Sequence, residues 1–128
     1  MKTIRAAIYR VGEEVEIRDV PDTLKDYQQI VDGRIDVATL VEDELVLVCN
    51  EEGIDLRLPP NRTYRFHNGE MGLAFGDFFV CRTKEGEFAG LTDADIQRLP
   101  SLIDERGESE RKIREMVNQA HEEEGKDD

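Results

Sequence analysis

Three arginines with an asparagine and a tyrosine between them are the residues of this sequence whose types and spacing best suit chemistry. Arg57, Arg62 and Arg65 fall within nine residues, and no acid lies among them. Guanidinium groups bind phosphate oxygens through paired hydrogen bonds, and a tyrosine ring offers a stacking face for a base. We therefore predict that Arg57, Asn61, Arg62, Tyr64 and Arg65 bind a small anionic ligand such as a nucleotide.

The sequence leaves a second interpretation of these arginines open. The acids Glu51, Glu52 and Asp55 precede them in the chain. Ion pairs between oppositely charged side chains at a protein surface are common, and they carry no ligand. Under this interpretation the arginines only neutralise the protein's own carboxylates.

Two consecutive prolines govern the backbone of the same stretch. Pro59 and Pro60 cannot donate a backbone hydrogen bond, so this segment must be a loop or the edge of a sheet. We expect Arg62 and Arg65 to belong to a loop rather than to the core. Replacing both by alanine should then abolish ligand binding and leave the fold intact.

No catalytic or metal-binding motif accompanies the arginines. The sequence has no GxSxG, GxxxxGK[ST], GxGxxG or HExxH pattern. Cys49, Cys81 and His67 lack the close ligand pairs of a structural zinc site, and His121 lies in an acidic run. We therefore expect a protein that is not an enzyme and that holds neither a metal nor a cofactor.

The charge balance limits the partners. The 128-residue chain has a formal net charge of −13, which repels polyanions, so direct nucleic-acid binding is not expected. The longest apolar runs are far shorter than a membrane span. Two cysteines in apolar stretches, without a cleavage site after the N-terminal residues, indicate the reducing cytoplasm.

The periodicity of apolar residues predicts an α+β fold around a small, largely antiparallel sheet. Alternating apolar residues and the turn residues between them predict an opening hairpin and a second hairpin. They also predict a strand over Leu73–Arg82 and a brief strand that returns along it. A well-defined helix should pack on the sheet, within residues 20–33. Asp22 or Thr23 suits its start and Gly33 its end.

The C-terminal third contains two more expected helices. Thr92 and Asp95 form a capping-box pattern that opens a short helix, which should end before Pro100. Residues 1–103 are predicted to form one domain, and residues 104–128 a helical extension with a disordered acidic end. The narrow apolar stripe of that extension could pack on the domain or on a sister subunit equally well. Homo-oligomerisation through it is therefore one expectation.

Several short patterns together resemble the family called domain of unknown function 3846. They are VLVCNEEG, LPPNR, GDFFVCR and GLTDADIQRL, within residues 3–99. The matching positions are Gly33, Asn50, Glu51, Glu52, Gly53, Leu58, Pro59, Asn61, Arg62, Gly76, Leu91 and Thr92. The resemblance implies small proteins of phages and mobile elements, and it carries over no reaction, cofactor or catalytic residue.

That setting implies a protein that counteracts bacterial host defence by binding. The arginine-rich stretch favours sequestration of a small anionic nucleotide signal. The alternative is an acidic mimic of nucleic acid that inhibits a CRISPR or restriction nuclease by occupying its basic groove. The expected partner is accordingly a small anion or a basic host protein.

Overall fold

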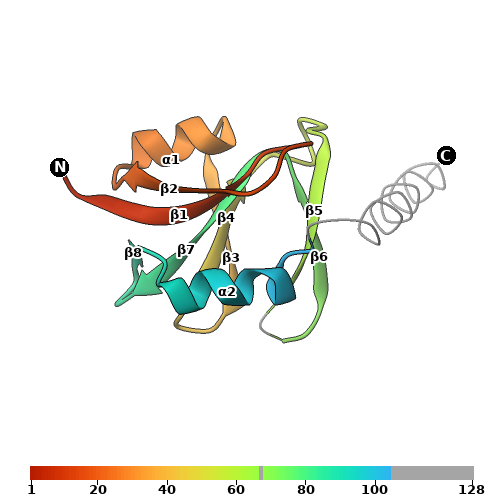
Figure 1. Ribbon diagram of the computed structural model, residues 1–128. Helices are drawn as coiled ribbons and strands as arrows, with labels where there is room; N and C mark the ends of the chain where they lie inside the picture. Colours follow the sequence, from red (N-terminus) through yellow and green to blue (C-terminus); the bar gives the residue numbers. More distant parts are fainter. Residues whose placement is uncertain (67, 105–128) are drawn as a thin grey trace, which may run out of the picture.

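An antiparallel sheet organises the protein, as seen in a computed structural model that describes residues 1–66 and 68–104. The elements in chain order are β1 (Thr3–Tyr9), β2 (Glu16–Pro21), α1 (Leu24–Val31), β3 (Ile35–Val41), β4 (Leu45–Asn50), β5 (Pro60–Arg65), β6 (Met71–Phe75), β7 (Phe78–Lys84), β8 (Glu87–Ala89) and α2 (Asp93–Leu102). The main sheet has the order β2-β1-β7-β4-β3, with β8 beside β7, and β5 and β6 form a second sheet (Figure 1). The expected α+β class is confirmed.

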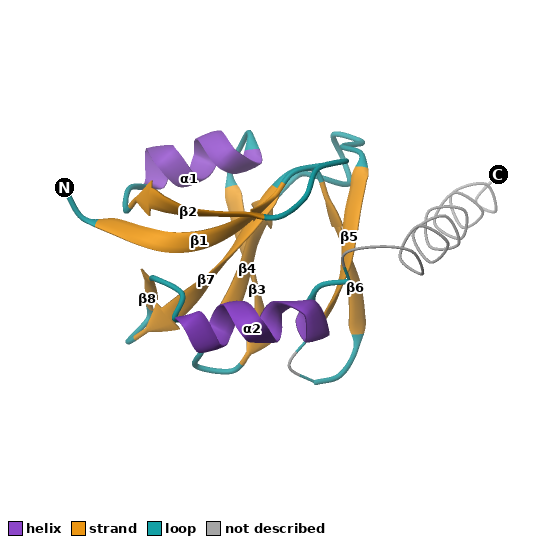
Figure 2. Cartoon of the chain, viewed as in Figure 1, coloured by secondary structure: helices purple, strands orange, loops and turns teal. Residues whose placement is uncertain are grey.

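Both faces of the main sheet are covered. Helix α1 lies on one face, where Tyr27 and Val31 join a cluster that includes Phe79 and Val48. Helix α2 and the β5–β6 sheet cover the other face, through Leu99, Tyr64 and Ala74 among others (Figure 2). Strands β4 and β7 are buried in most of their length because they lie between these two layers.

The two predicted hairpins are confirmed. Strand β1 pairs with β2, and β3 pairs with β4, both antiparallel. Thr23 caps α1, since its hydroxyl accepts a hydrogen bond from the amide of Asp26. At the other end the left-handed residue is Asp32 (φ 57°), not Gly33. Gly33 is needed for space, because a Cβ there would lie 2.6 Å from Nδ2 of Asn50.

Two predicted boundaries are wrong. The strand expected over Leu73–Arg82 is interrupted at Gly76 (φ 77°), where the chain leaves the β5–β6 sheet and enters the main sheet. Helix α2 was expected to end before Pro100, yet it continues through this proline to Leu102. The burial of Leu99 and Ile103 on either side outweighs the single hydrogen bond that a proline removes.

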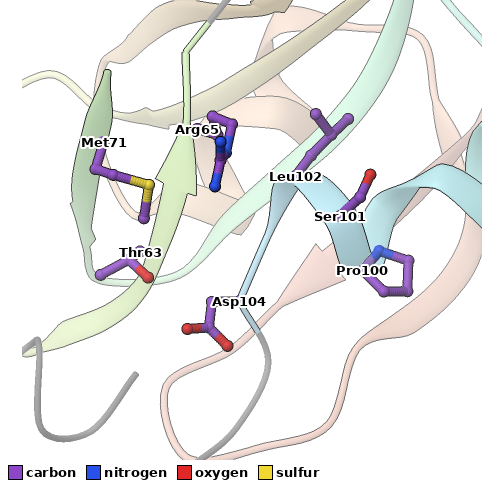
Figure 3. A pocket seen from close by; sticks show the side chains of 7 residues that line it. All are labelled: Thr63, Arg65, Met71, Pro100, Ser101, Leu102 and Asp104. Carbon is purple, nitrogen blue, oxygen red and sulfur yellow. The ribbon is translucent and has the colours of Figure 1, made fainter. Parts of the chain in front are cut away.

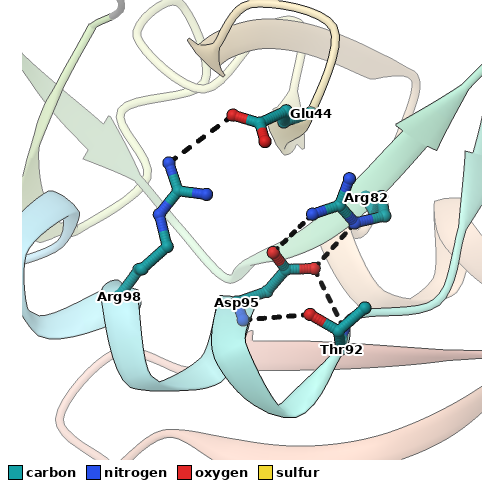
Figure 4. Close-up of polar contacts among 5 residues, drawn as sticks. All are labelled: Glu44, Arg82, Thr92, Asp95 and Arg98. Carbon is teal, nitrogen blue, oxygen red and sulfur yellow. Dashed lines mark hydrogen bonds and ion pairs between the residues drawn. The ribbon is translucent and has the colours of Figure 1, made fainter.

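The capping box of α2 is confirmed and is joined by an arginine. Thr92 and Asp95 exchange hydrogen bonds between side chain and backbone, as predicted. The buried carboxylate of Asp95 also accepts two hydrogen bonds from Arg82 of β7, at 2.8 and 2.6 Å (Figure 4). This bidentate pair fixes the start of α2 on the sheet.

The predicted C-terminal helix, its oligomerisation stripe and the disordered acidic end lie outside the described residues. So do His67 and His121. No helix in residues 1–66 or 68–104 has the length and apolar character of a membrane span.

Candidate functional site

Strand β5 separates the three predicted ligand-binding arginines. Arg57 is exposed in the turn before the strand, with a left-handed backbone (φ 55°). Arg65 is the last residue of β5, and Arg62 lies within it. Because a six-residue strand spans roughly 17 Å, Arg57 and Arg65 lie at opposite ends of β5 and do not share one ligand group.

The expectation that Arg62 belongs to a loop is wrong, because it is buried within β5. Only 7% of its surface is exposed. Its Nη1 donates to the carbonyl of Arg10 at 2.9 Å and to Oδ1 of Asn61 at 2.6 Å, and Nη2 donates to the carbonyl of Glu13. The guanidinium also lies 5.5 Å from the centre of the Tyr9 ring. Arg62 therefore ties the turn between β1 and β2 to β5.

Asn61 and Tyr64 are committed to the interior as well. Nδ2 of Asn61 donates to the carbonyls of Tyr9 and Gly76, both at 2.8 Å. The Tyr64 ring is 9% exposed and meets Phe66 edge-on with 5.0 Å between ring centres. Burial raises the pKa of its phenol. The ring does not present an open stacking face.

The described residues contain no ion pair that supports the interpretation in which the three arginines neutralise the protein's own carboxylates. Within residues 1–66 and 68–104, none of Arg57, Arg62 and Arg65 lies within 4.0 Å of a carboxylate oxygen. By contrast Arg82 and Arg98 do form such pairs, with Asp95 and Glu44. Among residues 1–66 and 68–104, the two exposed arginines at the ends of β5 therefore have no carboxylate partner.

One of the exposed arginines lines a pocket. A cavity of about 240 Å³ lies between the end of β5 and the C-terminal end of α2. Figure 3 shows the Arg65 side chain directed into this space, with Asp104 on the opposite side. The lining residues are Thr63, Arg65, Met71, Pro100, Ser101, Leu102 and Asp104. Of the five predicted ligand residues, only Arg65 belongs to it.

The other pocket residues were missed by sequence reasoning, although a signal existed. In an extended chain Thr63 and Arg65 point to the same side, and Arg62 and Tyr64 to the other. The double proline is compatible with a loop as well as with the edge of a sheet, and only an edge strand gives this alternation. Ser101 and Asp104 join the pocket only through the fold: the amide of Asp104 donates to the carbonyl of Thr63 at 3.0 Å.

The Thr63 hydroxyl is an unusual feature of the pocket floor. Thr63 is 0% exposed, and its Oγ1 has no hydrogen-bond partner in the described part of the chain. Burying an unpaired hydroxyl is unfavourable, whereas valine has the same shape and no polar atom. We expect Thr63→Val to raise the free energy of unfolding by about 1 kcal/mol in urea denaturation.

Thr92→Val provides the matched control for that substitution. The Thr92 hydroxyl caps α2, so its loss should lower the free energy of unfolding by about 1 kcal/mol. A loss of stability in Thr63→Val as large as that in Thr92→Val would show that the Thr63 hydroxyl has a partner in solution.

Metal ligands do not gather in the described residues. No group of three or more His, Cys, Asp or Glu side chains in residues 1–66 and 68–104 has the arrangement of a metal site. Cys49 and Cys81 are free thiols, and burial raises the pKa of Cys49 to about 11 and of Cys81 to about 12. Both thiols are therefore protonated and unreactive at neutral pH.

Comparison with known proteins places the chain in a family. The family model described as domain of unknown function (DUF3846) matches residues 4–104. The chain belongs to the DUF3846 family. No curated protein and no solved structure matches it.

Many positions on which the DUF3846 resemblance rests have structural roles in this protein. Asn50 donates to the carbonyls of Val31 and Asp32 at the end of α1, and its Oδ1 accepts from the amide of Glu52. Asn61 and Arg62 join β5 to the first hairpin in the same way. In this protein Asn50, Asn61 and Arg62 thus bind backbone groups, and their side chains have structural roles.

Proposed function

We propose that this DUF3846 protein is a non-enzymatic accessory protein of a phage or other mobile element. It acts in the bacterial cytoplasm and counteracts a host defence by sequestering a small anionic nucleotide signal. The observation that carries the proposal is Arg65, an exposed guanidinium without a described carboxylate partner that is directed into a pocket.

The remainder of the pocket supports binding rather than catalysis. Arg65 can donate two parallel hydrogen bonds to a phosphate group. The hydroxyl of Ser101 donates to the carbonyl of Arg98 at 2.6 Å, which leaves its lone pairs to accept from a ligand. Met71 and Leu102 supply apolar walls. No described nucleophile or general base lies among the lining residues with a partner that would activate it.

The nucleic-acid mimic is the second candidate, and a different observation favours it. The turn between β4 and β5 exposes Glu51, Glu52 and Asp55, and none forms an ion pair with a described cation. Together with the net charge of −13, these carboxylates suit a basic groove. We rank this candidate second because three exposed acids in one turn define a binding partner less specifically than a pocket does.

A retention experiment tests the sequestration proposal. Full-length protein is incubated with a bacterial nucleotide extract, washed, denatured by heat, and the released compounds are identified by mass spectrometry. We expect wild-type protein to release an intact nucleotide. Arg65→Ala should release less than about a tenth as much, since one charge-assisted contact contributes roughly 1.5–3 kcal/mol.

Arg57→Ala is the control for this experiment, because it removes an exposed arginine that is not in the pocket. It should retain as much nucleotide as wild type. Equal retention by Arg65→Ala and wild type would contradict the pocket assignment, and an altered ligand would indicate an enzyme. The mimic hypothesis predicts that nuclease inhibition is the same in all three proteins.

A further inference from the structure

The pocket contains two opposite charges that do not neutralise each other. Arg65 enters from the end of β5, and Asp104 enters from the segment that follows α2 (Figure 3). No ion pair within 4.0 Å joins them. The backbone hydrogen bond from Asp104 to Thr63 holds this segment against β5. A ligand between the two side chains would therefore meet a cation on one side and a carboxylate on the other.

The distribution of donors and acceptors narrows the ligand further. Arg65 has only donors, while the Asp104 carboxylate and the free lone pairs of Ser101 accept. A complementary ligand has one anionic group, and hydrogen-bond donors at some distance from it. Met71, Pro100 and Leu102 add apolar side chains to a lining that is mainly polar.

The charged residues of the pocket limit the negative charge that a bound ligand can carry. One guanidinium compensates about one negative charge, and Asp104 repels any further charge at close range. The net charge of −13 adds a repulsive field over the whole surface. Ligands with several phosphate charges are therefore disfavoured relative to a ligand with a single charge.

We propose that the pocket binds one ribonucleotide unit through a singly charged phosphodiester. The phosphodiester contacts Arg65, and the ribose 2′-hydroxyl donates a hydrogen bond to the carboxylate of Asp104. This inference rests on the proposed function and specifies its ligand. The cavity of about 240 Å³ is below the usual range of roughly 300–1,000 Å³ for ligand sites, which suits a single unit.

Isothermal titration calorimetry of the full chain tests the inference with defined probes. The probes are 3′,5′-cyclic AMP, its 2′-deoxy analogue, cyclic di-AMP and ATP. We expect wild type to bind cyclic AMP at least tenfold more tightly than ATP, and about tenfold more tightly than the 2′-deoxy analogue. Cyclic di-AMP carries two phosphodiester charges, so wild type should bind it less tightly than cyclic AMP, and tighter binding would contradict the limit of a single charge.

Asp104→Ala supplies the decisive variant. It should remove the preference for the 2′-hydroxyl and, by removing a like charge, bind ATP several-fold more tightly than wild type does. The backbone bond from residue 104 to Thr63 does not need the side chain, so the fold should persist, as circular dichroism would verify. Arg57→Ala should leave all affinities unchanged.

The possible failures separate this inference from the proposed function. An unchanged 2′-hydroxyl preference in Asp104→Ala, or tighter binding of ATP than of cyclic AMP by wild type, would overturn it. If no probe binds but an Arg65-dependent nucleotide is released from extract, sequestration stands and the phosphodiester assignment is wrong. If wild type neither binds a probe nor retains a compound from extract, both are wrong.

Discussion

Arg62→Ala is expected to lower the free energy of unfolding by about 3 kcal/mol, although sequence reasoning placed Arg62 in a ligand site. The substitution leaves the carbonyl of Glu13 and the side-chain oxygen of Asn61 without the guanidinium donor, and it removes one of the two donors to the carbonyl of Arg10, which keeps the amide of Glu13. Each buried unsatisfied acceptor costs roughly 1–3 kcal/mol, and the lost packing on Tyr9 adds to this. Partial access of water to the turn keeps the total below the simple sum.

Urea denaturation of three variants provides the measurement. Arg62→Lys should fall between wild type and Arg62→Ala, because a single ammonium cannot reach acceptors that the two guanidinium Nη atoms reach together. Arg57→Ala, which changes an exposed arginine of the same stretch, should lie within about 0.5 kcal/mol of wild type. A loss below 1 kcal/mol in Arg62→Ala would mean that the guanidinium contacts contribute little.

This expected loss changes how ligand binding is tested. The double substitution of Arg62 and Arg65 was expected to leave the fold intact, and the burial of Arg62 contradicts that. Reduced binding in the double variant would then report unfolding as readily as a lost contact. The single substitution Arg65→Ala avoids this ambiguity, because Arg65 is exposed at the end of β5.

Local patterns in the sequence predict those elements whose stabilising hydrogen bonds join residues close together in the chain. The first hairpin follows from alternation around a turn at Gly12, which has φ 77°. The cap of α1 and the capping box of α2 follow from hydrogen bonds between residues three apart. None of these features needs contacts from distant parts of the chain.

The features that sequence reasoning missed depend on distant contacts. The edge of a sheet, one of the two alternatives that the double proline left open, is confirmed, because Pro60 begins β5 of the two-stranded β5–β6 sheet; the burial of Arg62 within this strand was missed. The acid-free arginine run looked like a site because its partners are carbonyls, which every residue has and no sequence pattern reveals. Arg10 and Glu13 lie about fifty residues away from Arg62 in the chain.

The candidate pocket could be predicted only in part for the same reason. Arg65 was singled out by its residue type, but Asp104 and Ser101 reach it only because the chain after α2 runs beside β5, where Ile103 bridges to Tyr64. The pairing of a cation with a carboxylate in one cavity thus results from tertiary structure.

The pH dependence of stability gives the second large expected effect, and Asp95 is its source. The hydrogen bonds from Arg82 lower the pKa of Asp95 to about 2, and the hydrogen bonds from Thr92 contribute further. A carboxyl with a lowered pKa stabilises the fold fully above its unfolded value of 3.8, and this contribution disappears as the pH falls toward 2. The difference corresponds to about 2 kcal/mol.

Comparing wild type with Asp95→Asn in urea at several pH values isolates this contribution, because all other carboxyl groups titrate in both proteins. We expect wild type to exceed the variant by about 2–3 kcal/mol at pH 7 and by progressively less between pH 4 and pH 2. Asp93→Asn is the matched control. Asp93 lies in the same helical turn as Asp95 and pairs with Arg5 of β1, but its side chain is 86% exposed. Its difference from wild type at pH 7 should be smaller, because an exposed ion pair contributes little to stability. A gap between wild type and Asp95→Asn that persists unchanged at pH 2 would mean that the ionised carboxylate is not the stabilising group.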